Sequence, residues 1–74
     1  MAFKAKITEI SEVEQNLQQS ASFDILNAND KLITSGSARG DVEQLPEIIK
    51  SIVTEYELKY KSAKKLKVGD ILEV

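Results

Sequence analysis

The sequence contains no cysteine, no histidine and no tryptophan among its 74 residues, and it has only one proline. Without cysteine the chain can form neither a disulfide framework nor a thiolate nucleophile. Without histidine it lacks the commonest neutral metal ligand and the usual general base near pH 7. These absences lead us to expect no tightly bound metal, no cofactor and no enzymatic activity.

Long apolar runs are missing as well. Runs such as Ile25-Leu26 and Ile48-Ile49 fall far short of the roughly 20 residues that span a bilayer. Polar and apolar residues alternate soon after Met1, whereas a secretory leader would have an apolar block there. We therefore expect a cytoplasmic protein without membrane contact.

Charge is low overall but unevenly distributed. The formal net charge of −2 argues against general binding of polyanions, which depends on clustered basic residues. Half of the ten basic residues nevertheless fall between positions 59 and 67. They are Lys59, Lys61, Lys64, Lys65 and Lys67.

The proportions of apolar and charged residues, 42% and 30%, are those of a folded globular chain. Seventy-four residues are too few for two independent cores, so we expect a single α+β domain over residues 1–74. A chain of this size buries a modest share of its surface, and a partner subunit commonly compensates for this.

Alternating apolar residues predict three strands in the first half of the chain. The first covers residues 3–13 with a bulge, because Phe3, Ala5 and Ile7 alternate with polar residues. Residues 11–18 also fit a short capped helix, and we favour a strand end followed by a polar turn. A second strand begins near residue 19, and the turn at residues 27–30 leads into a third at residues 31–34. Residues 35–40 are expected to form a loop because of their glycine and serine content.

The clearest pattern is an amphipathic helix that ends near Lys61. Its start is expected between Asp41 and Leu45, with Asp41 as a cap and Pro46 in the first turn. Spacings of three and four place seven side chains on one stripe. These are Leu45, Ile48, Ile49, Ile52, Val53, Tyr56 and Tyr60.

Beyond the helix, residues 66–68 and 71–74 alternate like a strand around a turn at Gly69-Asp70. The predicted order is β-β-β-α-β, in which a small antiparallel sheet packs on one amphipathic helix. Such a sheet has two open edge strands, so we expect self-association into a homo-oligomer.

Two short motifs are candidate binding sites. Arg39-Gly40-Asp41 is the tripeptide that adhesion receptors bind, but a match of three residues often arises by chance. Residues 36–40 precede a helix, as phosphate-binding loops do, yet they lack the Lys-Ser/Thr of such a loop and are followed by Asp41 and Glu43.

Two carboxylate pairs, Glu12 with Glu14 and Asp41 with Glu43, are spaced for acid–base chemistry. They would lie on an open surface, where nothing separates the pKa values of the two members. We interpret both pairs as solvated charges.

The leading hypothesis is a non-enzymatic structural or assembly protein that acts through protein–protein contacts. Its candidate surfaces are the sheet edge, the loop at residues 36–41 with Arg39, and the lysine cluster. The alternative is a nucleic-acid-binding accessory protein, in which the five lysines hold the phosphates while Tyr56 and Tyr60 stack on bases. The plainer interpretation of the lysines, as solubilising groups at a helix end, is favoured over nucleic acid.

Three segments together resemble the small proteins of unassigned function that bacteriophages encode among their structural and accessory genes. They are Met-Ala-Phe-Lys-Ala-Lys-Ile-Thr at residues 1–8, the hairpin Ser-Phe-Asp-Ile-Leu-Asn-Ala-Asn-Asp-Lys-Leu-Ile-Thr-Ser-Gly-Ser at 22–37, and Glu-Ile-Ile-Lys-Ser-Ile-Val-Thr-Glu-Tyr at 47–56. The likeness is one of pattern and covers most of the chain. It implies a role in a virion or an assembly complex, and a location in the host cytoplasm or the virion.

Overall fold

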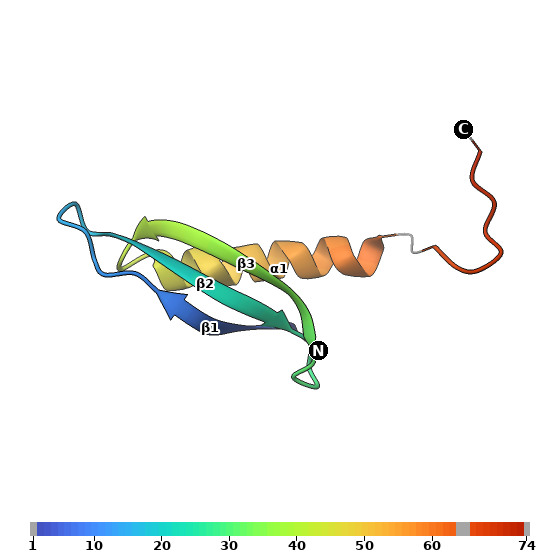
Figure 1. The fold of residues 1–74 in the computed structure, drawn as a ribbon, viewed down its shortest axis with the longest axis horizontal. Helices are drawn as coiled ribbons and strands as arrows, with labels where there is room; N and C mark the ends of the chain where they lie inside the picture. Colours follow the sequence, from blue (N-terminus) through green and yellow to red (C-terminus); the bar gives the residue numbers. More distant parts are fainter. Residues whose placement is uncertain (1, 64–65, 74) are drawn as a thin grey trace.

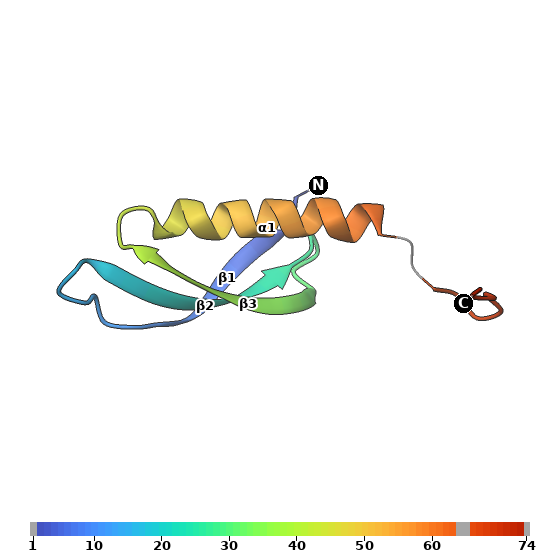
Figure 2. The same cartoon turned by 90° about the horizontal axis from the view of Figure 1, so that it is seen from above.

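The computed structural model describes residues 2–63 and 66–73, which form three antiparallel strands followed by one helix. The strands are β1 (Lys4–Ile10), β2 (Gln18–Leu26) and β3 (Leu32–Asp41), and the helix is α1 (Leu45–Ser62). Figure 1 shows the sheet from its open side, and Figure 2 shows that α1 forms a second layer against one face. The predicted α+β class is confirmed, and so are the first four elements, β-β-β-α, of the predicted β-β-β-α-β order.

The central strand β2 supplies half of the core. Its neighbours are β1 and β3, and both pair with it in antiparallel fashion. Ala21, Phe23 and Ile25 are buried against the helix, while the intervening Ser22 and Asp24 are more exposed. The alternation in the sequence therefore predicted correctly which side chains of β2 enter the core.

Both connections in the sheet are turns. The Asn27 side chain accepts hydrogen bonds from the N–H groups of Asn29 and Lys31, and Asp30 takes the left-handed conformation with φ 61°. Residues 11–17 contain no helix, so the favoured strand-and-turn alternative is confirmed. The bulge predicted in the first strand lies between Ile7 and Glu9, although β1 ends at Ile10 rather than near residue 13.

The loop predicted at residues 35–40 is wrong, because these residues belong to β3. Their glycine and serine content is typical of loops, but every one of them pairs with β2. A Cβ at Gly36 would lie 3.2 Å from Cζ of Phe23. A Cβ at Gly40 would lie 2.5 Å from Cδ1 of Ile48 on the helix. The glycines thus leave room for the core phenylalanine and for the close approach of α1.

The helix begins at Leu45, within the predicted interval, and Pro46 occupies its first turn. Leu45, Ile49 and Val53 are buried, and the rest of the predicted stripe is half-buried around them. The predicted cap is wrong: the N-cap residue is Gln44, and it makes no side-chain capping bond. Asp41 instead closes the preceding turn, where its side chain accepts a hydrogen bond from the N–H of Glu43 at 2.9 Å.

The fourth strand predicted after the helix is not present in the described residues 66–73. A turn does form there, since the N–H of Asp70 donates to the carbonyl of Lys67 and Gly69 has φ 97°. The segment lies beyond the C-terminal end of α1, away from the sheet in every view (Figure 1). Strand-like alternation therefore exists without a neighbouring strand to pair with.

The beginning of β1 is tied to the helix by Glu57. One carboxylate oxygen accepts a hydrogen bond from the Phe3 N–H at 2.7 Å, and the other accepts one from Nζ of Lys61 at 2.7 Å. The side chain of Glu57 is only 17% exposed. The bonds from Lys61 and Phe3 lower the pKa of Glu57 below its ordinary value of 4.5.

The lowered pKa of Glu57 predicts acid sensitivity. Because the pKa is lower in the folded state, the stabilisation is complete above the unfolded value of 4.5 and is lost as the pH falls through the folded value. We expect the urea midpoint of the parent protein to fall more between about pH 6 and about pH 3 than that of Glu57→Gln. Glu47→Gln, which removes a carboxylate from an exposed ion pair, is the control and should behave like the parent. An equal fall in Glu57→Gln and the parent would contradict this role for Glu57.

The core depends most on Phe23, which is fully buried. Phe23→Ala should cost about 3–5 kcal/mol, which approaches the whole stability of so small a domain. Urea denaturation followed by circular dichroism should show an early or non-cooperative transition. Leu32→Ala is the control, because Leu32 is 56% exposed and its truncation should change stability by no more than about 0.5 kcal/mol. If Phe23→Ala were as stable as this control, Phe23 would not be the residue on which the core depends most.

Candidate protein-binding surface

The apolar face of β1 is left uncovered. The register pairs Ile7 with Phe23 and Ile10 with Ala21, so these isoleucines point to the same side of the sheet as the core. Every residue of β1 is nevertheless exposed, with Ile7 at 49% and Ile10 at 62%. The cause is the position of α1, which packs more extensively on β3 than on β1.

The uncovered face forms one wall of a groove between β1 and the helix. The groove encloses about 600 Å³ and extends from Phe3 to the first turn of α1. Its apolar walls come from both layers: Phe3, Ile7, Ile10, Ala21, Leu45, Ile49 and Val53. Lys4, Lys50, Gln19 and Thr54 supply polar groups, and no aspartate or glutamate of the described residues lines it. A surface of this kind suits apolar side chains of a partner, with polar groups at the margin.

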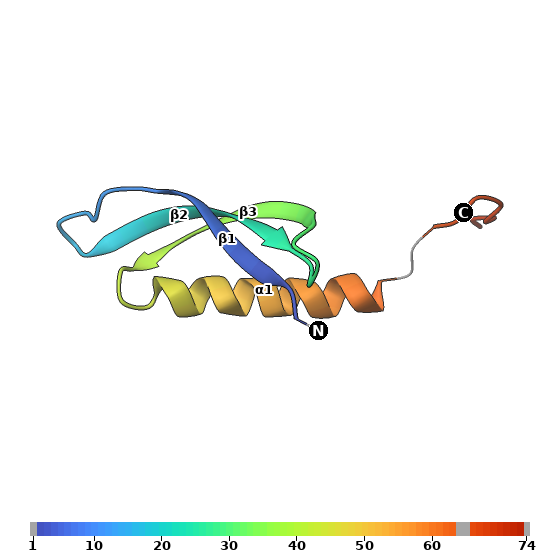
Figure 3. The ribbon, with the colours of Figure 1, turned by 90° about the horizontal axis from the view of Figure 1, so that it is seen from below.

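The outer edge of β1 adds backbone groups to the same surface. Within the described sheet, β1 pairs only with β2, so the N–H and C=O groups on its other side have no strand partner. Figure 3 shows β1 along the margin of the sheet, with its first residues beside the C-terminal half of α1. Such an edge can accept an added strand. The charges of Lys4, Lys6 and Glu9 along it restrict which strands are acceptable.

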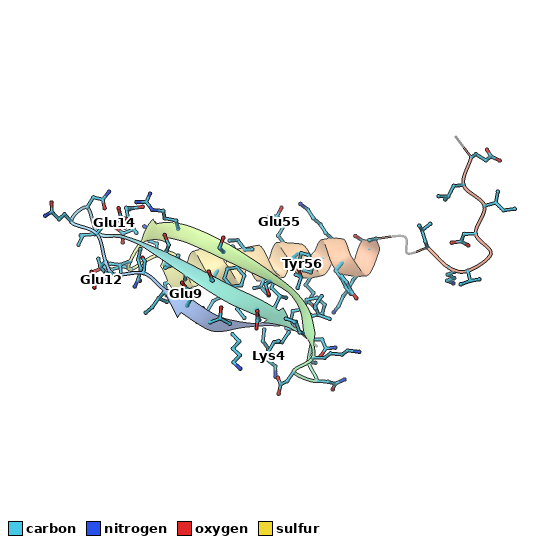
Figure 4. All side chains as sticks on the ribbon, in the orientation of Figure 1. Lys4, Glu9, Glu12, Glu14, Glu55 and Tyr56 are labelled. Carbon is cyan, nitrogen blue, oxygen red and sulfur yellow. The ribbon has the colours of Figure 1, made fainter. Side chains whose placement is uncertain are left out.

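Exposed apolar residues continue beyond β1. Val13 and Leu17, in the connection to β2, are 47% and 57% exposed. Figure 4 shows Glu12 and Glu14 at this tip, and the carboxylate of Glu14 lies 2.5 Å from Nη2 of Arg39. The tip therefore combines apolar and acidic side chains.

The lysine cluster is less positive than its sequence suggests. Lys59 Nζ lies 3.2 Å from Glu55, and Lys61 Nζ lies 2.7 Å from Glu57. Lys67 is exposed, in the segment beyond the helix. Lys64 and Lys65 lie outside the described residues.

The two tyrosines of the predicted nucleic-acid surface contact other rings. Tyr56 and Tyr60 stack with centroids 5.9 Å apart, and Phe3 meets Tyr60 edge-on at 5.6 Å. This aromatic cluster closes one end of the core beside β1. Both rings are half-buried, which limits the area they could offer to a base.

Arg39 is not brought to the lysine cluster. It lies near the end of β3, beside the start of α1, whereas Lys59 and Lys61 lie in the last turn of the helix. The prediction that Arg39-Gly40-Asp41 lies in a loop is also wrong, because the tripeptide is in β3 and pairs with residues 18–20, although Arg39 is exposed.

Sequence reasoning missed the groove even though it predicted the apolar face of β1. The signal lay in β3, where the residues facing the helix are small: Thr34, Gly36, Ala38 and Gly40. A helix can pack most closely over small side chains. It therefore lies over the flank of the sheet that carries them and leaves the other flank less covered.

Comparison of the chain with family models, curated proteins and solved structures gave no match. Within the described ranges, no group of acidic residues is arranged to hold a metal ion. No helix there is both long and apolar enough to cross a membrane.

Proposed function

We propose that this chain is a non-enzymatic assembly protein that acts through protein–protein contacts and self-associates, with the groove between β1 and α1 as its contact surface. The carrying observation is that Ile7 and Ile10 face the core side of the sheet yet remain about half exposed or more. Covering one such side chain contributes about 1.5–3 kcal/mol at most, and less when it is already half-buried. A partner that covers both would add substantially to a domain of this size.

The arrangement of polar groups supports the same proposal. The other face of the sheet carries Ser22, Asp24, Ser35 and Ser37, and Asp24 accepts a hydrogen bond from Ser35 at 2.7 Å. That face is suited to water. The groove is therefore the surface with most to gain from a partner. A virion or accessory role, implied by the resemblance to phage proteins, agrees with such a protein and stays a prediction.

Self-association through the groove has a direct test. Light scattering on the full chain should give a mass above the 8.2 kDa of one copy, and Ile10→Asp should lower the mass at equal concentration. The new carboxylate would lose its water if the groove were covered. Leu58→Asp is the matched control, because Leu58 is 66% exposed and does not line the groove. Circular dichroism would verify that both variants fold. A parent protein that is monomeric at all concentrations would refute the proposal.

Nucleic-acid binding is the second candidate, and the five lysines within nine positions support it. It predicts a shift of labelled DNA or RNA in a low-salt gel, weakened by added salt and by Lys64→Glu or Lys65→Glu. The ion pairs of Lys59 and Lys61 lead us to expect a weak effect. Absence of any shift at low salt would remove this candidate.

A further inference from the structure

We infer that the groove and the outer edge of β1 receive residues 66–73 of a second copy of this chain, in antiparallel orientation, so that two copies exchange their C-terminal segments. This rests on the proposed function and identifies the partner.

The segment carries four apolar residues that are largely exposed. Leu66, Val68, Ile71 and Leu72 are 68%, 108%, 90% and 67% exposed. Four large apolar side chains within seven positions are unusual for a tail that stays in water, since solvated tails are poor in such residues. The chain thus contains both an unfilled apolar groove and an unburied apolar segment.

The length of the segment matches the edge. Pairing along this edge requires the turn at Lys67–Asp70 to open. Once extended, eight residues span about 26 Å, at roughly 3.3 Å per residue. The seven residues of β1 need a strand of nearly this length. The segment contains no proline, so it can supply a backbone N–H at each position.

The path of the chain favours a second copy over the segment's own groove. Ala63 is extended, with φ −67° and ψ 134°, and residues 66–73 lie beyond the end of α1 (Figure 2). Phe3 contacts Tyr60 near the end of the helix, whereas Ile10 and Leu45 line the groove at its beginning. The strand β1 therefore runs opposite to α1. A segment folding back from the end of the helix onto its own groove would have to run parallel to β1.

Charge then separates the two orientations. In a parallel arrangement Lys67 would lie toward Lys6 and toward Lys4, which is paired with Asp30, and Glu73 would lie toward Glu9, so the like charges of Lys67 with Lys6 and of Glu73 with Glu9 would meet. In an antiparallel arrangement Lys67 lies toward Glu9, and Glu73 lies toward the two lysines. Like charges across neighbouring strands are unfavourable and opposite charges are favourable. The antiparallel arrangement requires a second copy.

The test measures the mass of full-length variants by light scattering and sedimentation. The parent should form a dimer, with about twice the 8.2 kDa of one chain. Val68→Asp/Leu72→Asp in the segment and Ile10→Asp in the groove should each raise the dimer dissociation constant by about tenfold or more. Leu58→Asp, equally exposed but outside both surfaces, should remain as dimeric as the parent.

Mixing the two defective variants provides the decisive measurement. The Ile10→Asp copy retains an intact segment, and the segment variant retains an intact groove, so one of the two exchanged contacts can form between them. A heterodimer should therefore appear where each variant alone is monomeric. If the parent is dimeric and the segment variant stays dimeric, this inference is overturned. The proposed function would still stand, because another part of the second copy would then cover the groove. A monomeric parent would overturn both.

Reversing the charge of Lys67 tests whether residues 66–73 run antiparallel or parallel to β1. Lys67→Glu should weaken the dimer, because its carboxylate would approach Glu9, and Lys67→Glu/Glu9→Lys should restore it. In a parallel arrangement Lys67→Glu would strengthen the contact with Lys4 and Lys6. A tighter dimer from Lys67→Glu alone would thus overturn the antiparallel orientation.

Discussion

The close approach of α1 to β3 determines most of the other features of this structure. Gly36 and Gly40 leave the space that Phe23 and Ile48 fill, so the helix can lie low over one flank of the sheet. A single helix in this position cannot also cover the opposite flank. The exposed isoleucines of β1 and the groove beside them follow from this offset. Packing over one flank of the sheet thus leaves an apolar surface uncovered on the other flank of the same face.

The same offset explains how β1 is held. Its apolar side chains contribute little to the core, whose buried members come from β2 and α1. Backbone pairing with β2 and the hydrogen bond from Phe3 to Glu57 therefore carry much of its attachment. Phe3 also packs on the core and meets Tyr60, which fixes the first residues of β1 at the C-terminal end of the helix. The strand is thus held at its first residues by α1, while its outer edge has no strand partner in the described sheet.

Periodicity predicted the elements that have a single dominant pattern. The alternation in β2 and the three-and-four spacing in α1 reflect burial directly, so both appear in the structure as predicted. Prediction from the sequence failed where the residue composition is typical of a loop but the tertiary position requires a strand. Residues 35–40 are small and polar like a loop, yet their small size is what permits a strand beneath a close helix. The groove could not be predicted, because the lateral position of a helix over a sheet depends on both layers at once.

The fourth strand that we predicted after α1 is absent from the described residues. A fourth strand could pair with the open edge of β1, beside the uncovered groove. Residues 66–73 have the alternation of a strand, yet they lie beyond the end of α1, away from β1 and its uncovered apolar face. A local pattern reports that a segment can pair, but it carries no information about which copy of the chain supplies the neighbour. Under the exchange inferred above, the β-β-β-α-β order would be realised between two copies. The fourth strand of each sheet would then come from the other, and each groove would be filled by residues that are exposed within a single chain.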